Sequence, residues 1–111
     1  MTRIEQLQQF LLENPQDPFL HYALAMEYAK LGDDEKTLTA FENMVKDYPD
    51  YVGTYYHFGK LLEKKGEPER AREIYLTGIQ MCRRLRNIHA LSELQGALNL
   101  LEGFGDEDED D

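Results

Sequence analysis

Apolar residues recur every three or four positions along most of the chain, which is the spacing of one face of an α-helix. Ile4, Leu7 and Leu11 begin this pattern, and it stops just before Pro15. Similar segments follow, each bounded by proline, glycine or a short acidic run. No segment alternates strictly between apolar and polar residues, as a half-buried strand does. The pattern predicts an all-α fold of about six antiparallel helices.

Start and stop signals set the expected ends of these helices. Thr2 and Glu5 form a capping-box pattern at the first helix, and Asp17 before Pro18 is typical of a helix start. The second helix is expected to end at Gly32, because glycine readily adopts the left-handed conformation that closes a helix. The same reasoning predicts a third helix that is opened by Asp33, Asp34 and Glu35 and ends near Asp47. A fourth helix is expected to be capped by Asp50 and to end at Gly66, and a fifth to run from Pro68 to about Arg84. A sixth is expected to be capped by Asn87 and to end at Gly103, and its apolar face would consist of Ile88, Leu91, Leu94, Leu98 and Leu101.

The sequence also repeats itself at an offset of 34 residues. Tyr22 then aligns with Tyr56 and Gly32 with Gly66. A helix–turn–helix period of this length is typical of tetratricopeptide repeats. Residues 18–51 and 52–85 resemble that family through Leu24, Ala25, Tyr28, Gly32, Phe41 and Pro49 in the first copy, and through Tyr55, Phe58, Gly59, Gly66, Ala71 and Tyr75 in the second. The copies depart from the family pattern at His21, Thr37 and Arg83.

The resemblance implies a right-handed superhelix in which three helical hairpins are stacked. A hairpin buries its apolar face only against its neighbours, so two repeats need flanking helices. The first helix would supply the second half of a preceding repeat, and residues 87–103 would form a C-terminal capping helix. Residues 1–104 are therefore expected to form a single domain, followed by a disordered acidic tail at residues 105–111.

The resemblance further implies a concave groove lined by the first helix of each repeat. Leu24, Ala25 and Tyr28 would then pack inward as core. Aromatic and methionine side chains provide contact area, and lysines favour acidic ligands. An alternative is that the aromatic side chains are core residues covered by the sixth helix. The expected groove residues are Phe19, Tyr22, Met26 and Lys30 in the first copy, and Gly53, Tyr56, Lys60 and Lys64 in the second.

Composition narrows the possible partners. The chain is 41% hydrophobic and 31% charged, as globular domains are, and no apolar run is long enough to span a membrane. A net charge of −10 disfavours binding to nucleic acid, although residues 60–86 are locally basic. Cys82 is the only cysteine, which excludes an intrachain disulfide and favours a reducing, cytoplasmic setting. The run of acids at residues 106–111 is either a solubilising tail or a competitor of acidic ligands.

Nothing in the sequence indicates catalysis, a metal site or a cofactor. His21, His57 and His89 fall on three different expected helices, and Gly32 and Gly66 are helix stops rather than parts of a phosphate-binding loop. We therefore expect a non-enzymatic adaptor that binds an unidentified protein or peptide in the concave groove. The alternative is a structural module that associates with itself. A monomer is favoured, and a homodimer is the other expectation.

Overall fold

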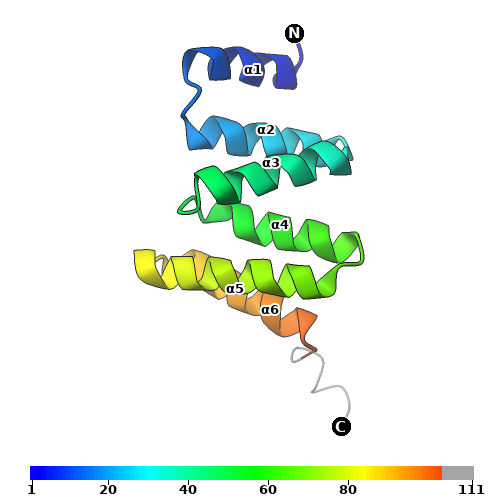
Figure 1. The fold of residues 1–111 in the computed structure, drawn as a ribbon, viewed down its shortest axis with the longest axis vertical. Helices are drawn as coiled ribbons and strands as arrows, with labels where there is room; N and C mark the ends of the chain where they lie inside the picture. Colours follow the sequence, from blue (N-terminus) through cyan, green and yellow to red (C-terminus); the bar gives the residue numbers. More distant parts are fainter. Residues whose placement is uncertain (104–111) are drawn as a thin grey trace. The chain divides into compact units, whose positions relative to one another are not determined.

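The computed structural model describes residues 1–103, and within that range it contains six α-helices and no β-strand (Figure 1). The predicted all-α class is confirmed. The expected disordered tail at residues 105–111 lies outside the described residues. None of the described helices is long and apolar enough to cross a membrane. The helices are α1 (Arg3–Glu13), α2 (Pro18–Lys30), α3 (Asp34–Asp47), α4 (Gly53–Lys64), α5 (Pro68–Leu85) and α6 (Ile88–Leu101).

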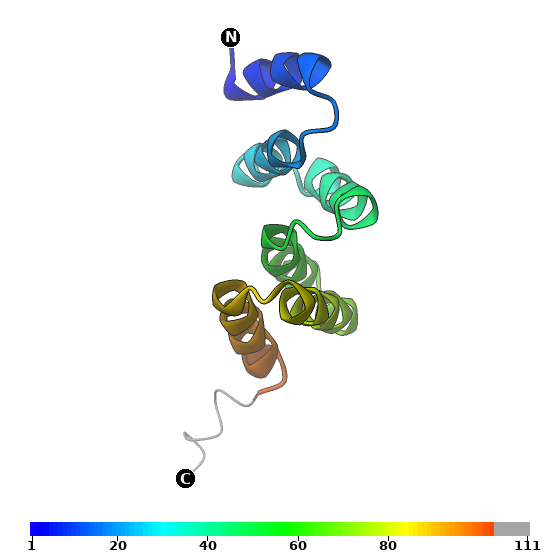
Figure 2. The ribbon, with the colours of Figure 1, turned by 90° about the vertical axis from the view of Figure 1, so that its left-hand side faces the viewer.

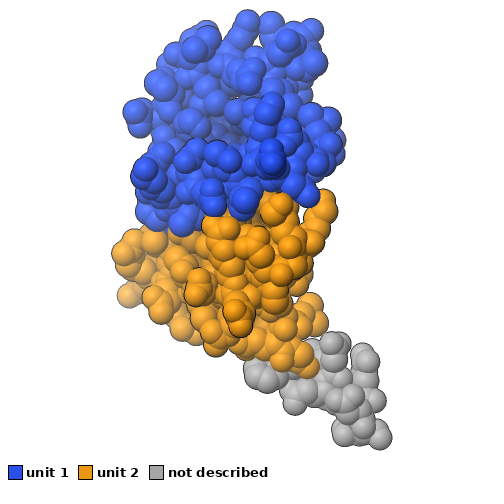
Figure 3. All heavy atoms as spheres, turned by 45° about the vertical axis from the view of Figure 1, so that its right-hand side comes forward, with its two compact units in different colours: residues 1–51 blue, residues 52–111 orange. Residues whose placement is uncertain are grey.

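The chain divides into two compact units, residues 1–51 and residues 52–111 (Figure 3). We call them the N-terminal unit, which contains α1 to α3, and the C-terminal unit, which contains α4 to α6. The single domain expected for residues 1–104 stays a prediction.

The ends of the first two helices follow the capping signals of the sequence. The Glu5 amide donates to Thr2 Oγ1 at 3.1 Å, and the Thr2 amide donates to the Glu5 carboxylate at 2.9 Å. Asp17 accepts a hydrogen bond from the Phe19 amide at 2.9 Å. Gly32 has φ of 77°, a backbone conformation that few other residues adopt without strain. The predicted starts of α1 and α2 and the predicted stop of α2 are confirmed.

The predicted cap of α4 is wrong. Helix α4 begins at Gly53, and the residue before it, Val52, provides no side-chain hydrogen bond to the first turn. Asp50 lies too early, because the chain first makes a turn in which the Tyr51 amide donates to the Tyr48 carbonyl at 3.0 Å. At α1 and α2 a side-chain oxygen accepts a hydrogen bond from a backbone amide of the first turn, and the N-cap residue of α4 provides no such acceptor.

In the N-terminal unit, α2 and α3 form a hairpin and α1 packs against α2 (Figure 2). Leu7 of α1, Ala25 of α2 and Phe41 of α3 are almost fully buried. Thr37, where the family pattern has alanine, is also buried, and its hydroxyl donates to the Asp33 carbonyl at 2.7 Å. Because this hydrogen bond satisfies the hydroxyl, the polar residue is tolerated in the core.

In the C-terminal unit, α5 packs against both α4 and α6. Two glycines allow α4 and α5 to approach closely, because a Cβ on Gly59 would lie 2.1 Å from the Tyr75 ring and one on Gly78 would lie 2.6 Å from the Tyr55 Cβ. The Tyr75 side chain fills the resulting contact and is completely buried.

Helix α6 covers α5 with Leu94, Ala97 and Leu98, all of which are buried. Ile88 was expected on the same face, and that prediction is wrong because its side chain is 77% exposed. Ile88 is the first residue of α6, directly after a tight turn in which Arg86 has φ of 58°.

Candidate functional site

Four of the predicted groove residues lie along α2, and we call Phe19, Tyr22, Met26 and Lys30 the α2 stripe. Phe19 is 55% exposed, Lys30 is exposed, and the other two side chains are partly exposed. The Tyr22 ring lies against the Tyr51 ring, with centroids 5.1 Å apart and an angle of 41° between the planes. The α2 stripe therefore offers apolar and aromatic surface to solvent, with one ring held in place by a neighbour.

The corresponding residues of α4 are Tyr56, Lys60 and Lys64, which we call the α4 stripe. Tyr56 and Lys60 are partly exposed and Lys64 is exposed, while Gly53 is the first residue of the helix. The Lys60 ammonium lies 5.6 Å from the centroid of the Tyr56 ring, within the range of a cation–π interaction. This contact keeps the lysine over the ring.

Glu63 belongs to the same surface, and sequence reasoning missed it. Its carboxylate lies 3.8 Å from the Lys60 ammonium and accepts a hydrogen bond of 2.5 Å from the Tyr75 hydroxyl. Burial, followed by this hydrogen bond to Glu63, raises the pKa of Tyr75 well above its usual range. The spacing of three residues between Lys60 and Glu63 was the available signal. The α4 stripe is consequently less cationic than its lysines alone indicate.

The described residues contain no grouping of three or more histidine, cysteine, aspartate or glutamate side chains that could hold a metal ion. Burial lowers the pKa of His57, an effect partly opposed by Glu93 of α6. Burial raises the pKa of the Cys82 thiol, which is inaccessible in the core of the C-terminal unit. An uncharged, buried thiol is a poor nucleophile.

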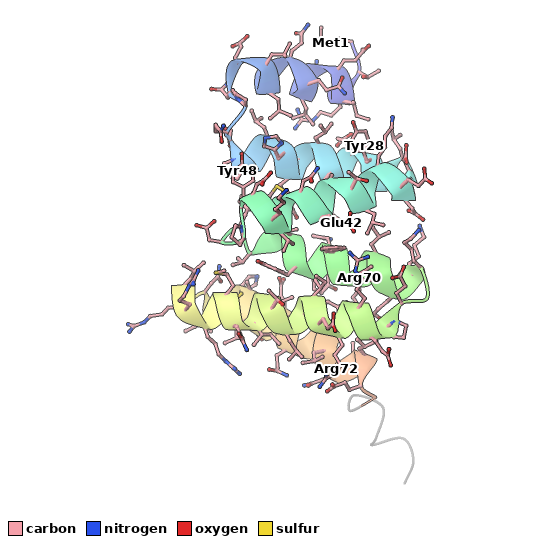
Figure 4. All side chains as sticks on the ribbon, in the orientation of Figure 1. Met1, Tyr28, Glu42, Tyr48, Arg70 and Arg72 are labelled. Atoms are coloured by element: carbon pink, nitrogen blue, oxygen red, sulfur yellow. The ribbon has the colours of Figure 1, made fainter. Side chains whose placement is uncertain are left out.

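A pocket lies between α2 and α3, and we call it the α2–α3 pocket. Its volume is about 560 Å³, and Tyr28 and Tyr48 lie at opposite ends of the hairpin that forms it (Figure 4). Leu24 and Tyr28 were expected in the core, but both are partly exposed and line this pocket, so that prediction is wrong. The remaining lining residues are His21, Glu35, Lys36, Thr39, Ala40, Asn43, Met44 and Asp47.

In the second copy of the repeat, the equivalents of two pocket residues are buried. Leu24 and Tyr28 correspond to Phe58 and Leu62, which are buried in the C-terminal unit. There Gly78 replaces Met44, and the short distance from Gly78 to Tyr55 shows that α5 closes over α4. In the N-terminal unit the equivalent position carries the Met44 side chain, which is almost fully buried and lines the pocket.

His21 also lines the α2–α3 pocket. It replaces an aromatic residue of the family pattern, and its Nε2 lies 2.7 Å from the Pro15 carbonyl oxygen while its ring stacks on Tyr48 at 5.5 Å. These contacts hold the imidazole at the end of the pocket and leave it half-buried. The departure at position 21 was the sequence signal for this surface.

Comparison with known proteins agrees with this architecture. Residues 52–84 match the family model described as tetratricopeptide repeat. A crystal structure of a tetratricopeptide repeat domain protein from Salinibacter ruber is 44% identical to the chain, covers 79% of it and 99% of that protein, and has a TM-score of 0.76. A solution structure of a tetratricopeptide repeat domain protein from the same organism gives 45% identity, coverage of 80% and 90%, and a TM-score of 0.77.

A solution structure of a protein from Bordetella parapertussis shares the fold at 22% identity, with a TM-score of 0.78 over 92% of the chain and 89% of that protein. Among curated proteins, none matches the chain.

Proposed function

The chain belongs to the tetratricopeptide repeat family, whose repeats form a general protein-interaction fold, and we propose that it binds a peptide segment of a partner protein along the α2 and α4 stripes. The observation that carries the proposal is the exposure of aromatic side chains at equivalent positions of both repeats. Tyr22 and Tyr56 are 34 residues apart, and both are partly exposed. Large aromatic side chains on a surface are typical of the residues that dominate binding energy.

The neighbours of these tyrosines support the proposal. Tyr51 packs against Tyr22, and Lys60 lies over Tyr56, so each ring has a defined orientation without being covered. A ring that is already oriented loses less conformational entropy when a ligand packs on it. Phe19 adds an exposed apolar anchor at the start of the α2 stripe.

The lysines would contribute a preference for acidic ligands. Lys30 and Lys64 are exposed in the last turns of α2 and α4. Lys60 contributes less, because Glu63 already lies near its ammonium group. We therefore expect apolar contacts to provide most of the affinity, with a charge preference that weakens as salt is added.

The experiment is a selection of peptides from a random phage-displayed library on the wild-type protein, followed by fluorescence anisotropy with the selected peptides. Tyr22→Ala and Tyr56→Ala should each weaken binding by tenfold or more, as expected for central aromatic residues, where truncation costs about 2 kcal/mol. Tyr28→Ala is the matched control, because Tyr28 is another partly exposed tyrosine of α2 but lies in the α2–α3 pocket. Peptides that tolerate both stripe substitutions but lose affinity with Tyr28→Ala would refute the proposal.

A further inference from the structure

The α2–α3 pocket has a chemical character that the proposed function does not use. Its middle is apolar, with Leu24, Ala40 and Met44 among the lining residues. Glu35 and Asp47 lie toward opposite ends of α3, about 18 Å apart along the helix axis. Within residues 1–103, neither carboxylate makes a side-chain hydrogen bond or an ion pair. The pocket thus combines an apolar centre with two uncompensated acids.

The surroundings of the pocket are also acidic. Residues 17–51, which contain the whole α2–α3 hairpin, carry eight acidic and three basic side chains. One of the three bases, Lys36, lines the pocket, and its ammonium lies 5.5 Å from the centroid of the Tyr28 ring. A surface with this charge balance attracts cationic groups.

A complementary surface lies at the turn between α5 and α6, and we call residues 83–88 the basic corner. Leu85 is 46% exposed and Ile88 is 77% exposed, and three arginines lie beside them at positions 83, 84 and 86. Neither the Arg83 nor the Arg86 side chain makes a hydrogen bond or an ion pair in the part of the chain that the structure describes. The basic corner therefore presents two apolar side chains surrounded by available guanidinium groups.

The backbone holds the basic corner in one conformation. The Arg86 amide donates to the Arg83 carbonyl at 3.2 Å, and the Asn87 amide donates to the Cys82 carbonyl at 2.9 Å. Asn87 also caps α6 by accepting a hydrogen bond from the Ala90 amide at 3.0 Å. Because the backbone is already fixed, only the side chains of the basic corner would have to be ordered on binding.

We propose that the basic corner of one copy of the chain docks into the α2–α3 pocket of a second copy. Leu85 and Ile88 would enter the apolar centre, and the arginines would meet Glu35 and Asp47. The pocket volume of about 560 Å³ lies in the usual range of ligand-binding pockets, so the pocket has room for these two apolar side chains. The apolar side chains of the basic corner would thus meet the apolar centre of the pocket, and its cationic groups would meet the two acids.

The contact joins two different surfaces, so it is heterologous, and each copy both donates a basic corner and accepts one. Assembly should therefore grow with protein concentration and weaken with salt, which screens the arginine–carboxylate pairs. The proposal uses residues outside the α2 and α4 stripes, and it can fail without affecting the proposed function.

The test uses two variants that each remove one of the two surfaces. Ile88→Asp places a charge on the basic corner at an exposed position, and Ala40→Arg places a long cation in the centre of the pocket. Circular dichroism should show that both variants keep their helices. The matched control is Leu100→Asp, which changes another exposed aliphatic residue of α6 that lies outside the basic corner.

Sedimentation velocity over a series of concentrations gives the readout. Wild type and Leu100→Asp should both associate, Ile88→Asp and Ala40→Arg should each sediment as monomers, and an equimolar mixture of those two variants should form a one-to-one dimer through the single intact contact. A wild-type protein that stays monomeric at every concentration would overturn the proposal. So would variants that associate on their own, or a mixture that does not form the dimer.

Discussion

Replacing Gly59 by alanine tests the contact that sets the distance between α4 and α5. A Cβ at this position would lie 2.1, 2.5 and 2.7 Å from three atoms of the Tyr75 ring, whereas carbon atoms in contact are ordinarily about 3.5–4.0 Å apart. The ring cannot move aside, because it is completely buried and its hydroxyl is bonded to Glu63. The two helices would have to separate.

The expected cost follows from two opposing effects. Overpacking a core costs about 1–3 kcal/mol, and the upper part of that range applies to a contact this short. Alanine also favours the helical conformation over glycine by about 1 kcal/mol, which offsets part of the loss. We expect Gly59→Ala to lower the free energy of unfolding by about 2 kcal/mol.

Gly96→Ala is the matched control, because Gly96 also lies inside a helix and a Cβ there would meet nothing within 4 Å. Only the helical preference remains, so this variant should gain about 0.5–1 kcal/mol. Urea unfolding followed by circular dichroism measures both changes. If the two variants shift the unfolding free energy in the same direction and by the same amount, the close packing of α4 on Tyr75 is refuted.

Two further predictions concern the C-terminal unit. Tyr75→Phe removes the donor to Glu63 and should cost about 1–2 kcal/mol near neutral pH. The pKa of Tyr75 is higher in the folded than in the unfolded protein. The contribution of the Tyr75 side chain to the free energy of unfolding is therefore complete below about pH 10, and it declines as the pH rises further, by up to about 1.4 kcal/mol per pH unit. Urea unfolding on both sides of that pH should show a steeper loss for wild type than for Tyr75→Phe, and equal slopes would contradict the assignment. Leu94→Ala in the buried face of α6 should cost about 2–5 kcal/mol of stability, whereas Leu100→Ala on its exposed side should change stability by less than about 0.5 kcal/mol. Thermal unfolding of the two variants measures this difference, and equal effects would show that α6 does not cover α5 as described.

The helices were predictable from the sequence because their ends depend on local chemistry. The Thr2–Glu5 capping box, the Asp17 cap and the glycine stop at position 32 act within a few residues of themselves, and all three are present in the structure. Asp50 failed as a cap because the length of the turn before α4 depends on how residues 48–51 fold. That turn has no equally simple signal in sequence.

The α2–α3 pocket and the Glu63–Tyr75 pair were not predictable in the same way. The repeat pattern assigns Leu24 and Tyr28 to the core, whereas in the structure both are partly exposed and line the pocket. The hydrogen bond between Glu63 and Tyr75 joins two helices, so it depends on how α4 and α5 are rotated against each other. Helical spacing places a residue on a face but does not fix that rotation.

The binding surface can be located directly by nuclear magnetic resonance with a peptide selected on the wild-type protein. Amide shifts of the ¹⁵N-labelled chain should change most around Tyr22 and Met26 of the α2 stripe and around Tyr56 and Lys60 of the α4 stripe. Changes concentrated instead on the α3 wall of the α2–α3 pocket, around Thr39 and Asn43, would contradict the claim that the two stripes hold the partner.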